Sequence, residues 1–115
     1  MNDTSGYNGW TNYPTWAVNL WLSNDEPLYR AATRIALTIV DEVENDENVT
    51  NGIWTISEAE RFRTADALKD LVNELSPELG ASFAADLYNW ALVQVDWHEI
   101  ADAWLETARE NREEA

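Results

Sequence analysis

Apolar residues recur at helical spacing along residues 27–44, and this pattern constrains the fold more than any other feature of the chain. Residues three and four positions apart share one face of an α-helix, so the spacing predicts an amphipathic helix with one buried side. The residues of that predicted buried side are Leu28, Ala32, Ile35, Ala36, Ile39 and Val43. Such a helix must pack against other elements, and the chain offers mainly helices for this.

Start and stop residues place further helices on both sides of this one. Pro14 suits a first helical position, and Ser57 with Glu60 matches a capping box. The predicted helices cover about 14–23, 27–44, 57–75, 82–94 and 97–111. Asn51-Gly52 between β-forming residues predicts a short hairpin or an extended loop near residues 48–56. We therefore expect a single mainly α domain over 1–115, a compact bundle of about five helices with an irregular lead-in over 1–12.

Helical spacing also predicts which apolar residues of the other helices are buried. In the first helix these are Tyr13, Trp16, Ala17, Leu20 and Trp21. In the fourth they are Phe83, Leu87, Trp90 and Ala91, and in the fifth Trp97, Ile100, Ala101, Trp104 and Ala108. Trp10 and Trp54 fall in predicted loops, so they are candidates for an exposed contact with a partner.

The chain carries 22 acidic and seven basic residues, a formal net charge of −15, although 45% of it is hydrophobic. Its aromatic and aliphatic content predicts a folded protein rather than an acidic disordered tail. Such a surface would be repelled by nucleic acid and by anionic lipid headgroups, so we expect no direct binding to either. With no cysteine, no apolar run of about 18 residues and a polar N-terminus, the sequence predicts a cytoplasmic protein.

Carboxylates follow one face of the last predicted helix. At 100° per residue they lie within about 80° of arc, opposite the apolar side, and extend over about 21 Å of helix. They are Glu99, Asp102, Glu106, Glu110 and Glu113. Ordinary exposed helices interleave Lys with Glu, whereas this row has only Arg109 and Arg112 on its flank.

Two further acidic groups accompany this row. One follows the third predicted helix and includes Asp70 and Glu74, and the other includes Asp41, Glu42 and Glu44. Carboxylates spaced along helices resemble the phosphates of a nucleic-acid strand. We therefore predict a non-enzymatic protein that mimics nucleic acid and inhibits a partner protein with a basic nucleic-acid-binding surface. An isologous dimer would extend the acidic surface, and the sequence leaves the oligomeric state open.

The alternative is that the acidity is an adaptation to a salty cytoplasm. Six of the seven basic residues are Arg and one is Lys69, a bias that halophilic proteins and G+C-rich genomes both produce. On this interpretation the protein is an interaction module that uses its aromatic N-terminal segment, with Trp10 and Trp54 as contacts. Mimicry should weaken with salt, whereas a halophilic fold should need molar salt.

The sequence matches known catalytic and metal-binding motifs only in part. His98 is the only histidine, and His98-Glu99-Ile100-Ala101-Asp102 lacks the second histidine of a zinc-protease motif. In the segment from Asp46 to Glu58, three positions match a calcium loop, but Gly52 and Glu58 each fall one residue late. We expect no metal and no cofactor, although the sequence leaves cation binding by this loop open.

Residues 7–16, Tyr-Asn-Gly-Trp-Thr-Asn-Tyr-Pro-Thr-Trp, are followed by Leu20-Trp21-Leu22 and Asn24-Asp25-Glu26. This opening resembles that of small proteins from phages, plasmids and archaeal or bacterial mobile elements, which often read G-W-x-N-Y-E-T-W. The resemblance covers about residues 7–30, with Pro14 in place of Glu. It implies no activity, but it implies a mobile-element context, in which acidic inhibitors of host restriction or CRISPR machinery recur.

Overall fold

The computed structural model describes residues 7–75, 80 and 82–114, with the backbone alone for 113 and 114. The elements are α1 (Tyr13–Asn24), α2 (Glu26–Glu42), η2 (Val43–Asn45), α3 (Glu47–Thr50), α4 (Ile56–Glu74), α5 (Phe83–Gln94) and α6 (Trp97–Glu114). No strand occurs in the part of the chain that the structure describes. The predicted helical bundle is therefore confirmed.

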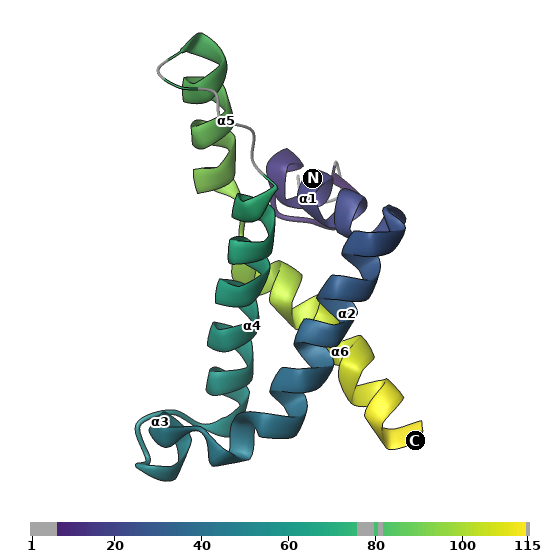
Figure 1. The fold of residues 1–115 in the computed structure, drawn as a ribbon, viewed down its shortest axis with the longest axis vertical. Coiled ribbons are helices and arrows are strands. Elements are labelled where there is room, and N and C mark those ends of the chain that lie inside the picture. Colours follow the sequence, from purple (N-terminus) through teal and green to yellow (C-terminus); the bar gives the residue numbers. More distant parts are fainter. Residues whose placement is uncertain (1–6, 76–79, 81, 115) are drawn as a thin grey trace.

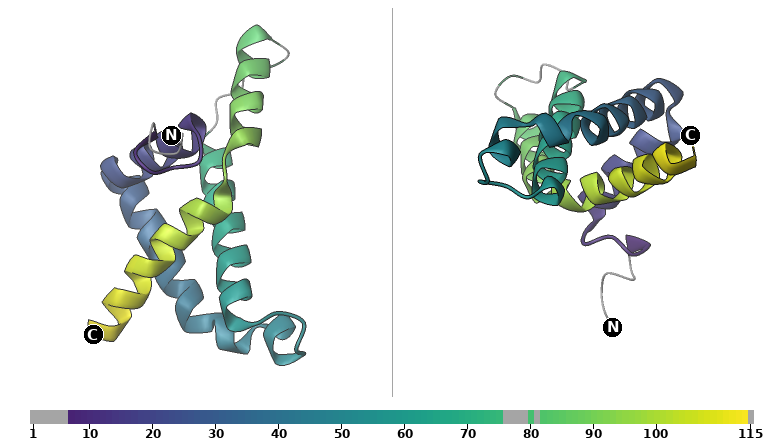
Figure 2. Two further views of the ribbon diagram at one scale, coloured as in Figure 1. Left: turned by 180° about the vertical axis from the view of Figure 1, so that it is seen from behind. Right: turned by 90° about the horizontal axis from the view of Figure 1, so that it is seen from below.

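The long helices α2 and α4 run antiparallel, and α6 crosses behind both of them (Figures 1 and 2). Helix α1 packs across the start of α2, and α5 extends beyond the end of α4. Short α3 lies at the opposite end of the molecule from α5. None of the described helices is both long and apolar enough to cross a membrane.

The core lies where α6 crosses α2 and α4. Ala32 and Ala36 of α2 and most members from α6 were predicted, whereas Val40 of α2 and Leu105 of α6 were not. The cluster consists of Leu22, Ala32, Ala36, Val40, Ala65, Leu68, Val95, Ile100, Ala101, Trp104, Leu105 and Ala108.

Burial in α1 and α5 was predicted wrongly. Tyr13, Leu20 and Trp21 are exposed on α1, which buries Thr15 and Leu22 instead. On α5 the exposed residues are Phe83, Leu87 and Trp90, while Ala85 is buried. The physical reason is that α5 packs chiefly against α1 and extends past the bundle, so that its outer side meets no other helix.

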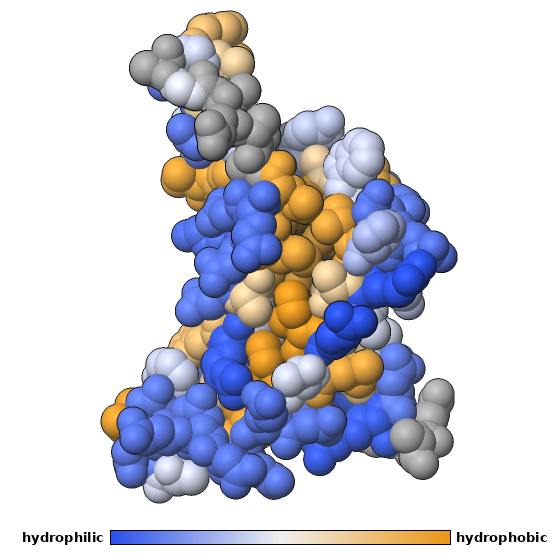
Figure 3. Space-filling model, in the orientation of Figure 1, coloured by the Kyte–Doolittle hydropathy of each residue, from blue (hydrophilic) through white to orange (hydrophobic). Residues whose placement is uncertain are grey.

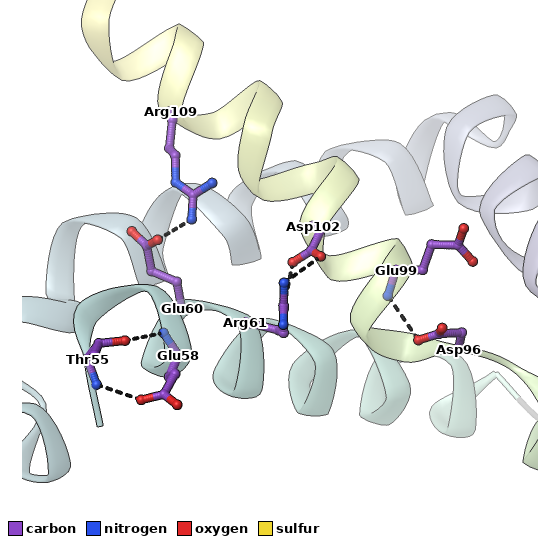
Figure 4. Close-up of polar contacts among 8 residues, drawn as sticks. All are labelled: Thr55, Glu58, Glu60, Arg61, Asp96, Glu99, Asp102 and Arg109. Atoms are coloured by element: carbon purple, nitrogen blue, oxygen red, sulfur yellow. Dashed lines mark hydrogen bonds and ion pairs between the residues drawn. The ribbon is translucent and has the colours of Figure 1, made fainter. Parts of the chain in front are cut away.

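The capping residue of α4 lies two positions before the predicted one. Thr55 caps the helix: its hydroxyl accepts from the Glu58 N–H at 3.1 Å, and the Glu58 carboxylate accepts from the Thr55 N–H at 2.9 Å (Figure 4). The capping box is thus Thr55 with Glu58, not Ser57 with Glu60. Glu60 cannot reach back to the helix start because its carboxylate is buried against Arg109.

The segment near residues 48–56 is a helical turn followed by a loop, and the hairpin alternative was wrong. Asp46 caps α3 by accepting from the Asn48 N–H at 2.8 Å, which starts a helix where a strand was expected. The chain then reverses at Gly52, whose φ of 77° favours glycine. The N–H groups of Ile53 and Trp54 both donate to the Asn48 carbonyl, closing the turn.

Polar side chains of the N-terminal segment tie α1 to the junction between α5 and α6. Asn12 caps α1, accepts from the Thr15 hydroxyl at 2.7 Å, and donates to the Gln94 carbonyl at 2.7 Å. The Thr15 hydroxyl in turn accepts from the Asp96 N–H at 2.9 Å. These bonds fix where α6 begins, and therefore where the acidic row on α6 lies.

Candidate functional site

The predicted acidic row on α6 is exposed on the side away from the core, but its members differ in what they contact. The first, Glu99, is half-buried and accepts a hydrogen bond from the Thr11 backbone N–H at 3.1 Å. Its own N–H donates to the Asp96 carboxylate at 3.1 Å, so that Asp96 caps α6 (Figure 4). Glu99 therefore holds the lead-in segment against α6 and has less of its charge available to a partner.

Asp102 forms a two-point ion pair with Arg61 of α4. The guanidinium donates from Nε at 2.9 Å and from Nη2 at 3.0 Å, one bond to each carboxylate oxygen (Figure 4). The hydrogen bonds from Arg61 to Asp102, aided by its negative charge, raise the pKa of Arg61, which keeps the guanidinium charged. The charge of Asp102 is thus neutralised by the protein itself.

The two arginines expected to flank the row turn toward the protein. Arg109 pairs with Glu60, whose carboxylate is buried on α4 (Figure 4). Arg112 donates to the Val40 carbonyl at 3.0 Å and lies 3.4 Å from the Asp41 carboxylate. Among the described residues neither arginine pairs with a carboxylate of the row, so Glu106 and Glu110 receive no counter-charge from this flank.

The second acidic group, at the end of α2, is also partly neutralised. Asp41 contacts Arg112, and Glu42 lies 3.3 Å from Arg63. Arg63 reaches Asp46 as well, at 3.8 Å. Glu44 is exposed and takes part in none of the ion pairs within the described residues.

Five predicted site residues stay exposed without an ion pair in the described part of the chain: Glu44, Glu106, Glu110, Asp70 and Glu74. Glu106 and Glu110 are one helical turn apart on α6, as are Asp70 and Glu74 on α4. Because the α4 pair lies opposite Leu68, which faces the core, the two pairs point in different directions. The side chain of Glu113 lies outside the described residues.

A cleft of about 480 Å³ lies between the start of α4 and α6. Its walls carry both signs of charge: Ser57, Glu58, Arg61, Asp102, Glu106 and Arg109. Arg61 already pairs with Asp102 there, and Arg109 with Glu60, so the cleft presents Glu106 as its one carboxylate without a partner among the described residues.

The residues considered for metal binding have other contacts. The His98 ring lies 5.6 Å from that of Phe62, and Asp46 and Glu58 cap helices. Within the described residues no three His, Cys, Asp or Glu side chains are grouped so that they could hold a metal ion.

The two tryptophans expected in loops are half-buried. Trp10 packs against the core, and the Trp54 ring lies 5.1 Å from that of Phe62. The most exposed tryptophans are instead Trp21 on α1 and Trp90 on α5. The sequence analysis missed the exposure of these two side chains because both fit a helical spacing that predicts burial. The local sequence does not indicate which helix lacks a neighbour on one side.

The fold and its charges define a small acidic helical bundle that pairs its arginines with its own carboxylates. The chain belongs to DUF7249, a family of unknown function whose family model matches residues 3–112. No curated protein and no solved structure is significantly similar to the chain.

Proposed function

We propose that this protein inhibits a nucleic-acid-binding protein of its prokaryotic host by presenting carboxylates in place of phosphates. It would act in the cytoplasm, without catalysing a reaction. The observation that carries the proposal is that five of the six arginines form ion pairs within the chain. They are Arg30, Arg61, Arg63, Arg109 and Arg112.

Internal pairing leaves the outer carboxylates facing solvent without counter-charges. On α6 and α4 the exposed pairs recur every four residues, which corresponds to about 6 Å along a helix. Phosphates of one nucleic-acid strand recur about every 3.4 Å of axis, so alternate phosphates match the carboxylate spacing. When these carboxylates enter a basic channel built for nucleic acid, they would displace the anions bound there into solvent. The release of those anions favours binding.

Exposure and the lack of an ion pair favour five of the predicted residues as carriers of this proposed function. Glu106 and Glu110 take the leading part, with Asp70, Glu74 and Glu44 in support, because all five are exposed and unpaired in the described residues. Asp102, Asp41 and Glu42 contribute less, since Arg61, Arg112 and Arg63 neutralise them.

Displacement of labelled DNA tests the proposal. A fluorescent duplex is bound to purified restriction or CRISPR-type complexes of the host, and the protein is titrated in while anisotropy is followed. We expect displacement from at least one complex, with an affinity that falls as sodium chloride is raised. The double variant Glu106→Gln/Glu110→Gln should weaken displacement roughly threefold to tenfold, since exposed charge pairs each contribute below about 1 kcal/mol.

The single variant Glu110→Gln is compared with Asp86→Asn as its matched control. Asp86→Asn removes one exposed carboxylate as well, but from α5, away from both acidic helices. We expect displacement within about twofold of the unmodified protein, because salt screens an exposed charge that lies more than about 10 Å from the contact. Equal losses from Asp86→Asn and Glu110→Gln would show that net charge acts rather than the α6 row, and absence of displacement from every complex would refute inhibition.

A further inference from the structure

Arg61 and Asp102 form an ion pair at the protein surface, within the acidic row of α6. Each of these side chains is 48% exposed, whereas the Glu60 side chain that pairs with Arg109 is 8% exposed. Exposed ion pairs contribute little to stability, because water and salt screen both charges. The fold therefore does not depend on the contact between Arg61 and Asp102, and a competing charge can reach either side chain.

The position of Asp102 makes this pair important for the row. Asp102, Glu106 and Glu110 follow one another at intervals of four residues, so they are neighbours along one side of α6. Glu106 and Glu110 take part in none of the ion pairs within the described residues, whereas Asp102 is neutralised by Arg61. A free Asp102 would give α6 a carboxylate on three successive turns, and the pair with Arg61 leaves two.

The cleft between α4 and α6 gives a second molecule access to this pair. Arg61, Asp102, Glu58 and Glu106 all line it, and its volume of about 480 Å³ admits a side chain from another protein. Glu58 precedes Arg61 by three residues on α4, a spacing at which an acidic and a basic side chain can meet. A guanidinium displaced from Asp102 therefore has a second carboxylate within the same cleft.

The geometry of the pair indicates which chemical group can replace Arg61. Two N–H groups of the guanidinium each reach one oxygen of the Asp102 carboxylate, at 2.9 and 3.0 Å (Figure 4). Arginine recognises carboxylates and phosphates in this two-point arrangement. Proteins that bind nucleic acid contact its phosphates with arginine and lysine. Asp102 is thus held by the same chemical group that a basic partner would bring.

We propose that Arg61 is an autoinhibitory contact, whose guanidinium occupies Asp102 until a basic side chain of the partner displaces it. The free protein presents Glu106 and Glu110, and the complex adds Asp102. Arg61 limits the affinity of the row, because the partner gains Asp102 only by breaking an internal ion pair. The inference rests on the proposed function, which makes the partner a basic protein, and it adds a residue that regulates binding at the same site.

Binding of a fluorescein-labelled decaarginine peptide tests this contact without a host protein. Anisotropy is measured at about 50 mM sodium chloride, where exposed charges are only partly screened. Arg61→Gln should bind the peptide about twofold to fivefold more tightly than the unmodified protein, the range expected for one freed exposed carboxylate. Arg61→Lys should bind it about 1.5-fold to twofold more tightly at unchanged net charge, because an ammonium lacks the two-point geometry. Both variants should keep their helical circular dichroism.

Arg30→Gln and Arg30→Lys are the matched controls for net charge. Arg30 pairs with Glu26 in another exposed ion pair, so Arg30→Gln frees a carboxylate that lies on α2 and not in the row. Controls are needed because Figure 3 shows hydrophilic residues on the face of α2 and α4 as well, so the peptide is attracted to more than the row. We expect Arg30→Gln to stay within about 1.5-fold of the unmodified protein, since salt screens charges distant from the row, and Arg30→Lys to match it.

Equal gains from Arg61→Gln and Arg30→Gln would show that net charge acts and would overturn the proposal. An unchanged or weaker affinity of Arg61→Gln would overturn it too. If Arg61→Gln lost its helical structure, Arg61→Lys would decide, and an affinity equal to that of Arg30→Lys would refute the contact. If no host complex is displaced but the peptide binds the variants in the expected order, the inhibitory function is refuted and the autoinhibitory contact stands. Displacement without that order would leave the function and refute the contact.

Discussion

The Thr15 hydroxyl on α1 and the Asp96 backbone N–H at the start of α6 form a 2.9 Å hydrogen bond between residues 81 positions apart. Thr15 is fully buried, and its hydroxyl also donates to Asn12. The Thr15 side chain therefore hydrogen-bonds both to Asn12, which caps α1, and to a backbone N–H at the start of α6. This makes a threonine, rather than an aromatic residue, the main contact between the N-terminal helix and the start of α6.

Thr15→Val should lower the free energy of unfolding by about 1–2 kcal/mol, because the Asp96 N–H loses its acceptor at a part-buried position. Urea unfolding followed by tryptophan fluorescence measures this change. The control is Thr38→Val, the same replacement at an exposed position of α2, where we expect a change within about 0.5 kcal/mol. Equal midpoints for the two variants would contradict the role assigned to Thr15.

The position of the α4 cap is tested by two neighbouring alanine variants. Thr55→Ala should cost about 0.5–2 kcal/mol, since it removes the oxygen that accepts from the Glu58 N–H. Ser57→Ala should change stability little, because Ser57 lies inside the helix and does not cap it. Thermal unfolding of the two proteins distinguishes these caps, and a larger loss from Ser57→Ala would favour the start predicted from sequence.

We expect the ion pair between Arg109 and the buried Glu60 carboxylate to contribute more to stability than the exposed pair between Arg30 and Glu26. Arg109→Met leaves the Glu60 carboxylate buried without its partner, and we expect a loss of about 1–3 kcal/mol, reduced from the value for fully buried pairs because Arg109 is partly exposed. Arg30→Met is the control, since it breaks the exposed pair with Glu26 and should cost below about 0.5 kcal/mol. Chemical denaturation of both variants provides the comparison, and similar losses would show that burial of Glu60 is unimportant.

The salt dependence of folding distinguishes an acidic surface that serves binding from one that adapts the protein to a salty cytoplasm. The core and helix caps do not need added ions, so we expect cooperative helical unfolding at about 50 mM sodium chloride, with a melting temperature that rises as salt screens repulsion between carboxylates. Far-UV circular dichroism melts from low to molar salt measure this. A fold that appears only at molar salt would mark the acidity as halophilic adaptation.

Sequence periodicity predicted α2 and α6 well because each has one apolar and one charged side. It failed for α1 and α5 because these helices are apolar nearly all round, and periodicity then cannot identify the buried side. The side that packs is decided by neighbouring helices, and the sequence pattern does not contain that information.

The acidic row was also only partly predictable. Its placement on the outer side of α6 followed from 100° spacing, and the exposure of Glu106 and Glu110 agrees with it. The pairing of Asp102 with Arg61, 41 residues away, depends on how α4 and α6 cross. Charge neutralisation across helices is a tertiary property, so counting carboxylates along one helix overestimated the available negative charge.

The contacts that hold the N-terminal segment have a consequence for synthesis of the chain. Thr11, Asn12, Thr15 and Asn19 bond to residues 88, 82, 81 and 85 positions later. At about 5–20 residues per second, a ribosome needs roughly 4–16 s to add that much chain. Throughout that interval α1 has none of these partners, although it has already been synthesised. The aromatic helix at the N-terminus is therefore among the last to reach its final position, and a nascent chain stalled before α6 would leave its tryptophans open to chaperones.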